Sequence, residues 1–370
     1  MCLNRGGKVL KVAIITFHWA TNYGAVLQSY ALQNILQRLG VDKVRIIDYY
    51  PKHYKKYRFF IKQTLKSIIR FDPKGIVRGL ICISKETKIE HFRKDNLMRT
   101  QYFCSDKVLK NRLEHYDVYF CGSDQIWNIS FTENGEGRGK NTYTYYLDFA
   151  PNDAVKASYA ASFGETEYKT KLIASIKQCL DRFDFISVRE KTGVEILKKM
   201  NIDNAEIVPD PTLLLEKRAY ERFVKNESIL GKYAFVYILH GKDNDAKSLV
   251  EKLHQDGYNI LKSGDEGVEE WLTYIHNAEC VVTNSFHGIV FSIIFERPFV
   301  AFFVSGSGMN DRIITLLEEL GLGNRIFDGD ISIINNEIDW DSVKDKLNRY
   351  RKGGIDYLIR VLESGKQNKE

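Results

Sequence analysis

The sequence predicts an α/β protein with two Rossmann-like domains that face a cleft. Apolar runs of strand length alternate with stretches whose apolar residues recur at helical spacing. This alternation starts again after a Pro-rich stretch near residue 210. The 370 residues also exceed the usual size of one domain. We therefore expect an N-terminal domain of residues 1–218 and a C-terminal domain of residues 219–370, the second ending in a helix.

The N-terminal domain opens with a strand, a helix and a second strand. Residues 9–17 are continuously apolar, as in buried parallel strands. Apolar residues then recur at helical spacing until Gly40, and residues 42–50 resemble a strand. This order is typical of the right-handed crossover of an open α/β sheet. Further along we expect a strand and turn at 116–127, a strand at 155–164, a helix near 168–183, a short strand at 185–190 that becomes a helix at Arg189, and a Pro-rich turn within 205–215.

The C-terminal domain repeats the pattern. Its elements are expected as strands at 233–239, 259–263, 280–285 and 298–304, with helices near 244–256, at 268–278, from 287 onward and at 310–322. The last 30 residues resemble a helix followed by a charged tail. In sheets of this kind ligands bind at the carboxyl ends of the strands, beside helix N-termini.

The net charge of +6 is unevenly distributed. Residues 51–110 hold 16 Lys and Arg against 5 Asp and Glu, and cations alternate there with aromatic and aliphatic residues. We expect this segment to be a basic helical insertion in the N-terminal domain. It could contact an anionic membrane surface or a phosphorylated partner, or it could simply be a solvated basic face over a core-facing stripe.

The six cysteines form no CxxC pair and no metal-binding pattern. Cys121 and Cys280 stand in apolar runs and should be buried. Residues 1–7 do not resemble a signal peptide, so we expect a cytoplasmic protein with reduced thiols. The GxGxxG and GxxxxGK[ST] fingerprints are absent, and we expect neither a metal nor a nucleic-acid partner.

Titratable residues collect at the predicted strand ends. Arg189, His287 and Arg312 are each expected in the first turn of a helix, where the positive end of the helix disfavours a cation. A bound anion would remove this penalty, so together they would form a receptor for a small, multiply charged anion. The alternatives are a surface ion pair for Arg189 and a core histidine for His287, and the turn at 122–128 could be a capped turn with Trp127 in the core.

Six motifs occur in an order that resembles the polysaccharide pyruvyl transferase family. They are TFHWATNYGAVLQSYALQ, GSDQIWN, YAASFG, SVRE, PDPTLLL and NSFHGIVFSIIFERPFV, and the resemblance runs from about residue 12 to residue 322. It implies a fold like that of the GT-B glycosyltransferases. It also implies transfer of a pyruvyl group from phosphoenolpyruvate to a sugar of a bacterial surface polysaccharide precursor, giving a cyclic ketal.

The resemblance also implies roles for residues. By motif match His287 would be the general acid, and Arg189 and Arg312 would be anion ligands. Beyond the resemblance, we expect the donor to contact also Ser285, Asn284, Gly288, Ser305 and Gly306, and the acceptor to contact Asn22, Tyr23, Gly24, Gln28 and Ser123. Asp124 would take the proton of the attacking hydroxyl, or it could serve only as a turn cap. One departure concerns Ser285, since better known branches of the family carry an Arg two positions before the His. Arg312, Arg297 or the amides of residues 305–308 could replace that guanidinium.

Two other functions stay open. One is a GT-B-like glycosyltransferase that uses a nucleotide sugar, and the other is a non-catalytic sugar- or anion-binding member of a polysaccharide assembly complex. In the favoured function phosphoenolpyruvate is a co-substrate, no cofactor is needed, and the acceptor could be linked to a lipid diphosphate. The basic 51–110 segment would then hold the protein at the inner face of the membrane. We expect His287→Ala and Arg189→Ala to abolish transfer while folding stays nearly intact.

Overall fold

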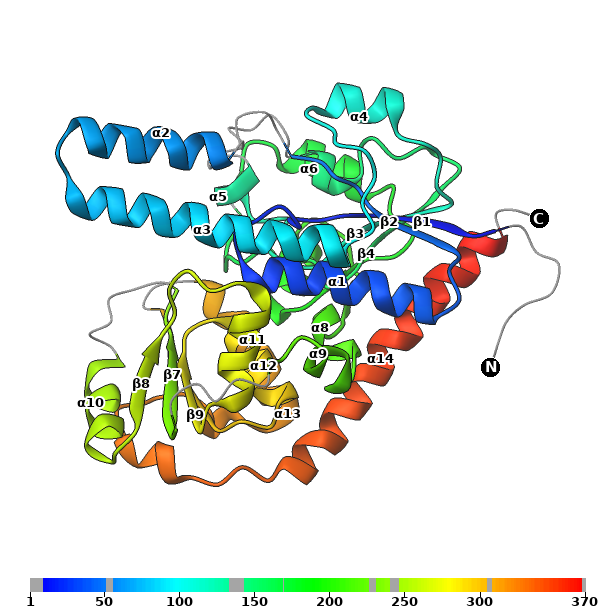
Figure 1. Cartoon of the computed structure of the whole chain (residues 1–370). Coiled ribbons are helices and arrows are strands. Elements are labelled where there is room, and N and C mark those ends of the chain that lie inside the picture. Colours follow the sequence, from blue (N-terminus) through cyan, green and yellow to red (C-terminus); the bar gives the residue numbers. More distant parts are fainter. Residues whose placement is uncertain are drawn as a thin grey trace. The chain divides into compact units, whose positions relative to one another are not determined.

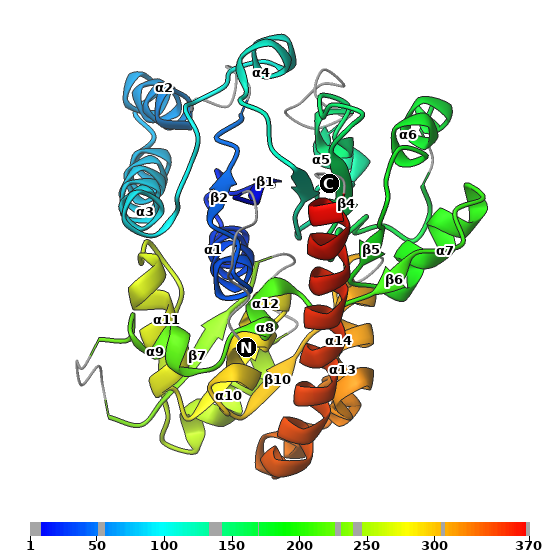
Figure 2. The same cartoon turned by 90° about the vertical axis from the view of Figure 1, so that its right-hand side faces the viewer.

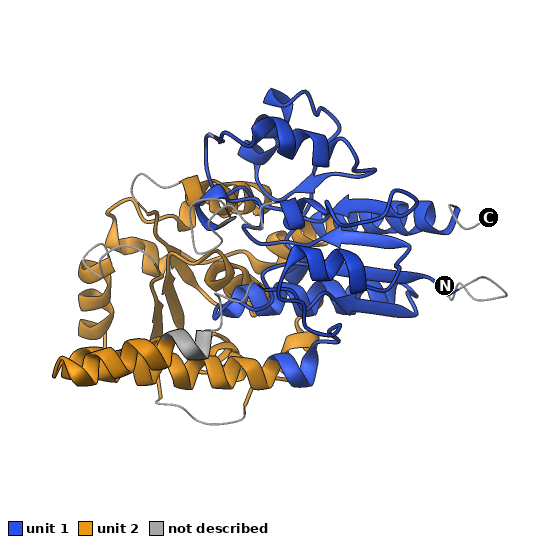
Figure 3. Cartoon of the chain, turned by 90° about the horizontal axis from the view of Figure 1, so that it is seen from above, with its two compact units in different colours: residues 1–59, 93–214, 350–370 blue, residues 60–92, 215–349 orange. Residues whose placement is uncertain are grey.

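The computed structural model describes residues 9–50, 56–132, 143–168, 170–225, 231–239, 246–304 and 308–367, without the side chains of residues 56–59 (Figure 1). The chain forms two compact units (Figure 3). Unit 1 comprises residues 1–59, 93–214 and 350–370, and unit 2 comprises residues 60–92 and 215–349. The chain passes from unit 1 to unit 2 after residue 214, close to the boundary expected at residue 218. Residues 60–92 belong to unit 2, although we expected them in the N-terminal domain. Residues 350–370 belong to unit 1, although we expected them in the C-terminal domain.

Unit 1 is built on a parallel sheet with the strand order β2-β1-β3-β4. Its strands are β1 (Lys11–Ile15), β2 (Lys43–Ile46), β3 (Val118–Cys121) and β4 (Val155–Ser158). A further parallel pair, β5 (Ser187–Val188) and β6 (Glu206–Ile207), adjoins β4 through single bridges. Strands β1, β3, β4 and β5 are almost wholly buried, which explains the apolar runs in the sequence, whereas both residues of β6 are exposed.

Helix α1 (Tyr23–Arg38) covers one face of this sheet, as Figures 1 and 2 both show. The Asn22 side chain caps the helix by accepting a hydrogen bond from the Ala25 amide at 3.1 Å. The other helices that lie wholly or partly in unit 1 are α2 (Lys56–Ile69), α3 (Pro73–Asn96), α4 (Asp106–Arg112), α5 (Ile129–Thr132), η2 (Tyr143–Tyr146), α6 (Ile173–Leu180), α7 (Lys191–Lys199), α8 (Pro211–Leu214) and α14 (Trp340–Gln367).

Unit 2 contains a second parallel sheet, with the order β8-β7-β9-β10. Its strands are β7 (Tyr233–Tyr237), β8 (Asn259–Lys262), β9 (Cys280–Thr283) and β10 (Phe299–Ala301). Its helices, apart from the shared α2, α3 and α14, are α9 (Arg218–Glu221), α10 (Lys247–Gln255), α11 (Val268–Asn277), α12 (Phe286–Ile294), η4 (Gly308–Asn310), α13 (Asp311–Leu320), η5 (Gly323–Arg325) and η6 (Ile331–Asn335). In both sheets the second strand in the chain lies on one side of the first strand and the third lies on the other, so each unit has a topological switch point.

Two expectations about local structure are wrong. Residues 211–214 form the short helix α8, because Pro211 occupies a first helical position, where its missing N–H has no partner to lose. Helix α7 begins at Lys191 with Glu190 as its N-cap, so Arg189 precedes the helix and is not in its first turn. Cys121 and Cys280 are buried as expected, and Trp127 lies in the core, stacked on Tyr146 at 5.3 Å.

Candidate functional site

In unit 2 the ends of β7 and β9 are tied together by side chains. The Thr283 hydroxyl donates to the Tyr237 carbonyl at 2.6 Å. The side-chain oxygen of Asn284, Oδ1, accepts a hydrogen bond from the Leu239 backbone amide at 2.8 Å. These two contacts lie at the switch point of the sheet, where α/β proteins bind ligands. Asn284, which we expected to contact the pyruvyl donor, therefore already makes a hydrogen bond within the fold.

Helix α12 begins at this point, and His287 is its second residue, in the first turn as expected. Ser285 is the N-cap and accepts the Gly288 amide at 3.2 Å. A Cβ atom at residue 288 would lie 2.6 Å from the Thr283 hydroxyl, so only glycine fits between the helix and the end of β9. The imidazole is largely buried, with 7% of His287 exposed. Ser285 and Gly288 thus fix the position of His287.

Arg312 is the second residue of α13 and lies close to the start of α12. Its guanidinium is 5.6 Å from the centre of the Phe286 ring, and that ring meets His287 edge-on at 5.2 Å. The loop before α13 is closed by Asn310, which exchanges hydrogen bonds with the Val304 backbone at 2.8 and 3.0 Å. The start of α12, the His287 imidazole and the Arg312 guanidinium thus lie close together in unit 2, and each can bind an anion, while Asp311 places one carboxylate in the first turn of α13. Ser305 and Gly306 lie outside the described residues.

Arg297 is at the wrong edge of the sheet to replace the missing arginine at position 285. It lies two residues before the start of β10, which runs parallel to β9, whereas His287 follows the end of β9. Arg297 also acts electrostatically on Tyr233, the first residue of β7, although burial is the main cause of the raised pKa of that tyrosine. Of the two arginines expected as replacements, Arg312 is the one that lies beside the start of α12.

The sequence reasoning missed two polar groups at the same edge of unit 2. Burial raises the pKa of Tyr237 well above its usual value, the charge of Glu266 adds to this, and a hydrogen bond with Ser285 opposes it. The Glu266 carboxylate is buried at the end of β8, where it accepts hydrogen bonds from the Ser263 hydroxyl and the Gly264 amide. A motif search could not find Glu266, because only the parallel sheet brings it to this edge.

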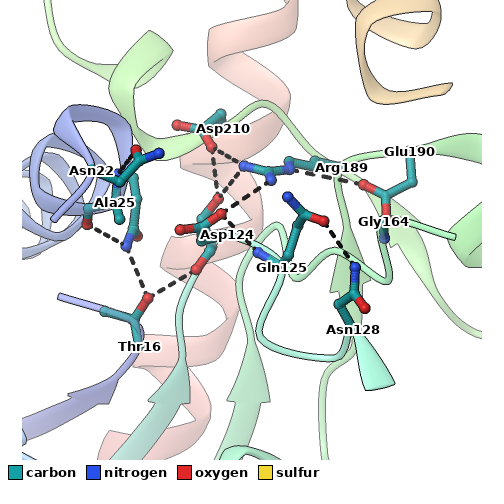
Figure 4. Close-up of polar contacts among 12 residues, drawn as sticks. Thr16, Asn22, Ala25, Asp124, Gln125, Asn128, Gly164, Arg189, Glu190 and Asp210 are labelled. Carbon is teal, nitrogen blue, oxygen red and sulfur yellow. Dashed lines mark hydrogen bonds and ion pairs between the residues drawn. The ribbon is translucent and has the colours of Figure 1, made fainter. Parts of the chain in front are cut away.

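In unit 1 a buried network surrounds Arg189 (Figure 4). Its Nη1 donates to Asp210 at 2.8 Å and to the Ser123 hydroxyl at 3.3 Å. Longer ion pairs link Nη2 to Asp124 at 3.6 Å and Nε to Glu190 at 3.8 Å. The side chains of Arg189 and Asp210 are 1% and 0% exposed. The guanidinium is therefore neutralised by carboxylates of its own unit, and a helix-dipole penalty does not apply to it.

The carboxylates of this network are held by further hydrogen bonds. Asp210 accepts the amide and hydroxyl of Thr212, and Glu190 accepts the Phe163 amide at 2.8 Å. Asp124 accepts the Gln125 amide and has the positive φ of 82°, a conformation that non-glycine residues rarely adopt. Its side chain is 16% exposed, the most of the three carboxylates.

The expected acceptor residues of unit 1 surround this network but are mostly buried. Gln28 donates to the Thr16 hydroxyl at 2.8 Å, and that hydroxyl donates to the Ser123 carbonyl at 2.9 Å. Tyr23, Gln28 and Ser123 have no exposed surface, and Gly24 is buried beside them. Asn22 is half-buried and serves as the cap of α1. Thr16 and Asp210 are the connecting residues that the sequence did not single out.

A second buried ion pair lies after β1. His18 has no exposed surface; its Nε2 lies 3.1 Å from Asp48 and its Nδ1 lies 3.2 Å from the Thr16 carbonyl oxygen. Burial raises the pKa of Asp48, but the hydrogen bond and charge of His18, with the charges of Arg99 and Arg93, outweigh it and lower the pKa below its usual value. This pair fixes the loop between β1 and α1.

The described residues contain no group of three or more His, Cys, Asp or Glu side chains arranged to hold a metal ion. None of the helices in the described part of the chain has the length and apolar character needed to cross a bilayer.

Two parallel sheets with helices beside the ends of their strands define an α/β protein of the GT-B-like class. Solved structures share this fold at low sequence identity. The UDP-N-acetylglucosamine 2-epimerase of Rickettsia bellii aligns over 96% of this chain and 97% of its own, at 12% identity and a TM-score of 0.51. The UDP-GlcNAc 2-epimerase of Methanocaldococcus jannaschii aligns over 96% of this chain and 100% of its own, also at 12% identity and a TM-score of 0.51. The E. coli heptosyltransferase WaaC with ADP aligns over 84% of this chain and 98% of its own, at 11% identity and a TM-score of 0.40, which is too low to bear on the fold.

Residues 22–305 match the polysaccharide pyruvyl transferase family. The matched region is well over half of the chain, so the protein belongs to this family, as its motifs suggested. No curated protein is significantly similar to the chain in sequence.

Proposed function

We propose that this protein transfers the pyruvyl group of phosphoenolpyruvate to a sugar of a bacterial surface polysaccharide precursor, forming a cyclic ketal. The observation that carries the proposal is that His287 and Arg312, in the first turns of α12 and α13, both lie against the Phe286 ring. Membership of the family supports a transferase that acts on polysaccharide precursors.

The donor carries a carboxylate and a phosphate, and both need positive partners. In unit 2 these are the Arg312 guanidinium and the helix N-termini that follow Asn284 and Asn310. In unit 1 we assign to the donor the Nη2 side of Arg189, which makes the longer ion pair with Asp124, while Nη1 is bound to Asp210. The expected contacts of Ser305 and Gly306 would complete the anion site.

The reaction begins with proton transfer from His287 to the methylene carbon of the donor. The electron pair of the C=C bond forms the new C–H bond, and positive charge develops at the neighbouring carbon. A sugar hydroxyl attacks this carbon and gives its proton to Asp124. The C–O bond to phosphate then breaks with its electron pair, and phosphate leaves with the proton held by Asp124. A second sugar hydroxyl closes the ketal and gives its proton to His287, which restores the acid. General acid help of this kind is typically worth roughly 10²–10⁴-fold in rate.

The acceptor belongs on the unit 1 network in this proposal. Apart from the Nη2 side of Arg189, this cluster offers mainly the oxygens of three carboxylates, and these hydrogen-bond acceptors suit the hydroxyl groups of a sugar. Asp124 is the carboxylate with the most exposed surface and therefore the candidate base. Ser123 and Gln28 act by holding the network in place, since they are buried. Asn22, Tyr23 and Gly24 fix the start of α1 beside it.

The finer expectations complete the proposal. The acceptor sugar is carried on a lipid diphosphate, and the protein works at the inner face of the membrane, with the basic 51–110 segment as its contact. A glycosyltransferase using a nucleotide sugar would share the fold, and a non-catalytic member of a polysaccharide assembly complex would bind a sugar or an anion without reaction. Ser285 keeps the latter open, because in this chain it caps α12 in the place of a family arginine.

The test is phosphate release from phosphoenolpyruvate in the presence of a panel of carrier-linked sugars. We expect the wild type to release phosphate with one of them and His287→Ala to lose at least about 100-fold in rate. His254→Ala, an exposed histidine of α10 in the same unit, is the matched control and should keep full activity. Full turnover by His287→Ala, or no phosphate release with any acceptor while nucleotide sugars bind, would overturn the proposal.

A further inference from the structure

The hairpin formed by α2 and α3 exposes an unusual amount of apolar surface. Figure 1 shows the two helices running antiparallel. Half of the exposed large apolar side chains in the described part of the chain lie between residues 61 and 81. Phe71, in the turn between the helices, is 90% exposed and Ile69 is 76% exposed. The full set is Ile61, Leu65, Ile68, Ile69, Phe71, Val77, Leu80 and Ile81.

These side chains do not form the interior of the hairpin. Only Thr64 and Gly79 are buried among residues 60–81. A Cβ at residue 79 would lie 2.0 Å from the Thr64 hydroxyl, and one at Gly75 would lie 2.4 Å from the Ser67 hydroxyl. The two helices therefore touch through small residues, and the large apolar side chains point elsewhere. The stability of the hairpin does not explain why they are apolar.

The following part of α3 is fixed to unit 2. The Ser84 hydroxyl donates to Asp265 at 2.7 Å, and Lys88 pairs with Glu270 at 3.2 Å. Phe92 packs edge-on against Phe223 at 5.0 Å. The later part of α3 is thus anchored to the rest of unit 2, and the exposed stripes continue from this anchored helix.

Cations flank the apolar stripe on both helices. In α2, Lys62, Lys66 and Arg70 each follow an apolar residue of the stripe by one position, which corresponds to a rotation of about 100° around the helix. In α3, Arg78 follows Val77 of the stripe in the same manner, and Lys74 lies in the first turn of the helix. The only carboxylate of residues 60–81 is Asp72, which accepts the Gly75 amide at 3.0 Å at the start of α3. An apolar stripe bordered by cations is typical of helices that lie in a membrane interface.

Phe71 adds a further observation. Its φ of 50° is in the left-handed region, which glycine and asparagine occupy more readily than a bulky residue. The turn therefore carries a fully exposed phenylalanine at a position where the backbone favours a smaller residue. A role outside the fold explains this choice.

We propose that residues 60–81 dock the protein on an anionic phospholipid bilayer, with the apolar stripe in the acyl region and the cations at the level of the lipid phosphates. A phosphorylated protein would need the cations but not the apolar stripe. A second copy of the chain would bring two hairpins of the same positive charge together. An anionic lipid surface accommodates both the apolar stripe and the cations. This proposal assigns the membrane contact of the 51–110 segment to the hairpin of residues 60–81.

Docking would serve catalysis only if the acceptor is carried on a lipid, and this part of the inference rests on the proposed function. Binding itself needs neither donor nor acceptor. The experiment is flotation of the full chain with vesicles of phosphatidylcholine and phosphatidylglycerol, and with phosphatidylcholine alone. Failure to bind vesicles would therefore refute the docking proposal alone, while phosphate release in solution tests the transferase proposal separately.

Two triple variants test the two features of the surface. Leu65→Ser/Ile69→Ser/Phe71→Asn removes apolar side chains, and its control carries Ile173→Ser, Ile207→Ser and Ile359→Ser, which alter apolar side chains exposed elsewhere. The charge variant carries Lys62→Gln, Lys66→Gln and Lys74→Gln, and its control carries Lys198→Gln, Lys247→Gln and Lys344→Gln.

We expect the wild type to bind the anionic vesicles, with affinity that falls as salt rises, and each hairpin variant to lose at least about tenfold in affinity. The controls should bind like the wild type, and all variants should unfold at similar temperatures, since exposed residues are replaced. Equal binding by the hairpin variants, equal loss in the controls, or a wild type that self-associates through the hairpin without binding vesicles would overturn the proposal.

Discussion

Asp210 is the central carboxylate of the buried network around Arg189 in unit 1. It binds the Arg189 guanidinium at 2.8 Å and the Ser123 hydroxyl at 2.7 Å, and both partners are buried with it. A buried ion pair stabilises a fold little compared with an apolar pair of the same shape, but removal of one member leaves an uncompensated charge. Arg189 therefore has a structural role in addition to any contact with the donor.

The expectation that Arg189→Ala leaves folding nearly intact is replaced by a different prediction. Because Asp210 would stay buried without its cation, we expect Arg189→Ala to lower the free energy of unfolding by about 3–5 kcal/mol. Chemical denaturation measures the change. Arg360→Ala breaks an exposed pair with Glu206 at 2.6 Å and should cost less than about 1 kcal/mol. Equal stability of the two variants would contradict the role given to Asp210.

Asp48 makes the stability of unit 1 depend on pH. Its pKa is lower in the folded protein than the ordinary value of 3.8, so it contributes stability above about pH 4 that is lost as pH falls through the folded pKa. We expect Asp48→Asn to be less stable than the wild type at pH 7 by roughly 1–3 kcal/mol, with a difference that shrinks below about pH 4. Thermal unfolding across this range measures it, and a difference independent of pH would refute the assignment.

At the scale of elements, the start of α12 is the best defined feature of unit 2. Thr283 ends β9, Ser285 caps the helix, and Gly288 lets the first turn approach the strand closely. Because His287 stands between the cap and this glycine, its position depends on the fit of helix to strand.

A methyl group at residue 288 tests this fit. Gly288→Ala would place Cβ 2.6 Å from the Thr283 hydroxyl, so we expect a loss of about 1–3 kcal/mol in stability and a lower rate of phosphate release. Gly323→Ala is the control, since no atom lies within 4 Å of its Cβ position. Phosphate release at the wild-type rate by Gly288→Ala would show that the position of His287 does not depend on this contact.

The sequence predicts elements well where the local pattern is strong. Helix α1 has a capping asparagine and a long apolar periodicity, and its observed bounds are close to those expected. The start of α7 was misplaced by two residues, because the cap is Glu190 and nothing in the local pattern distinguishes it from Arg189. The hairpin of α2 and α3 shows a different limit, since an apolar stripe has the same spacing whether it faces a core or solvent.

For the whole molecule, the two sheets share one strand order, and each places polar side chains at its switch point. The motifs predicted the family and the positions of His287 and Arg312 in their helices. They did not predict the partners of Arg189, because Asp210 and Ser123 reach it only when strands far apart in sequence pair in the sheet. Long-range contacts of this kind carry no local signal.

The central claim is that the pyruvyl carbons of phosphoenolpyruvate end in a ketal on a sugar. The most direct measurement is carbon NMR of the reaction with phosphoenolpyruvate labelled at its second carbon and the acceptor that supports phosphate release. We predict a labelled quaternary ketal carbon on the sugar, formed in the same amount as free phosphate and absent with His287→Ala. Phosphate released as fast with the label recovered as free pyruvate, or a sugar transferred from a nucleotide carrier with phosphoenolpyruvate untouched, would contradict it.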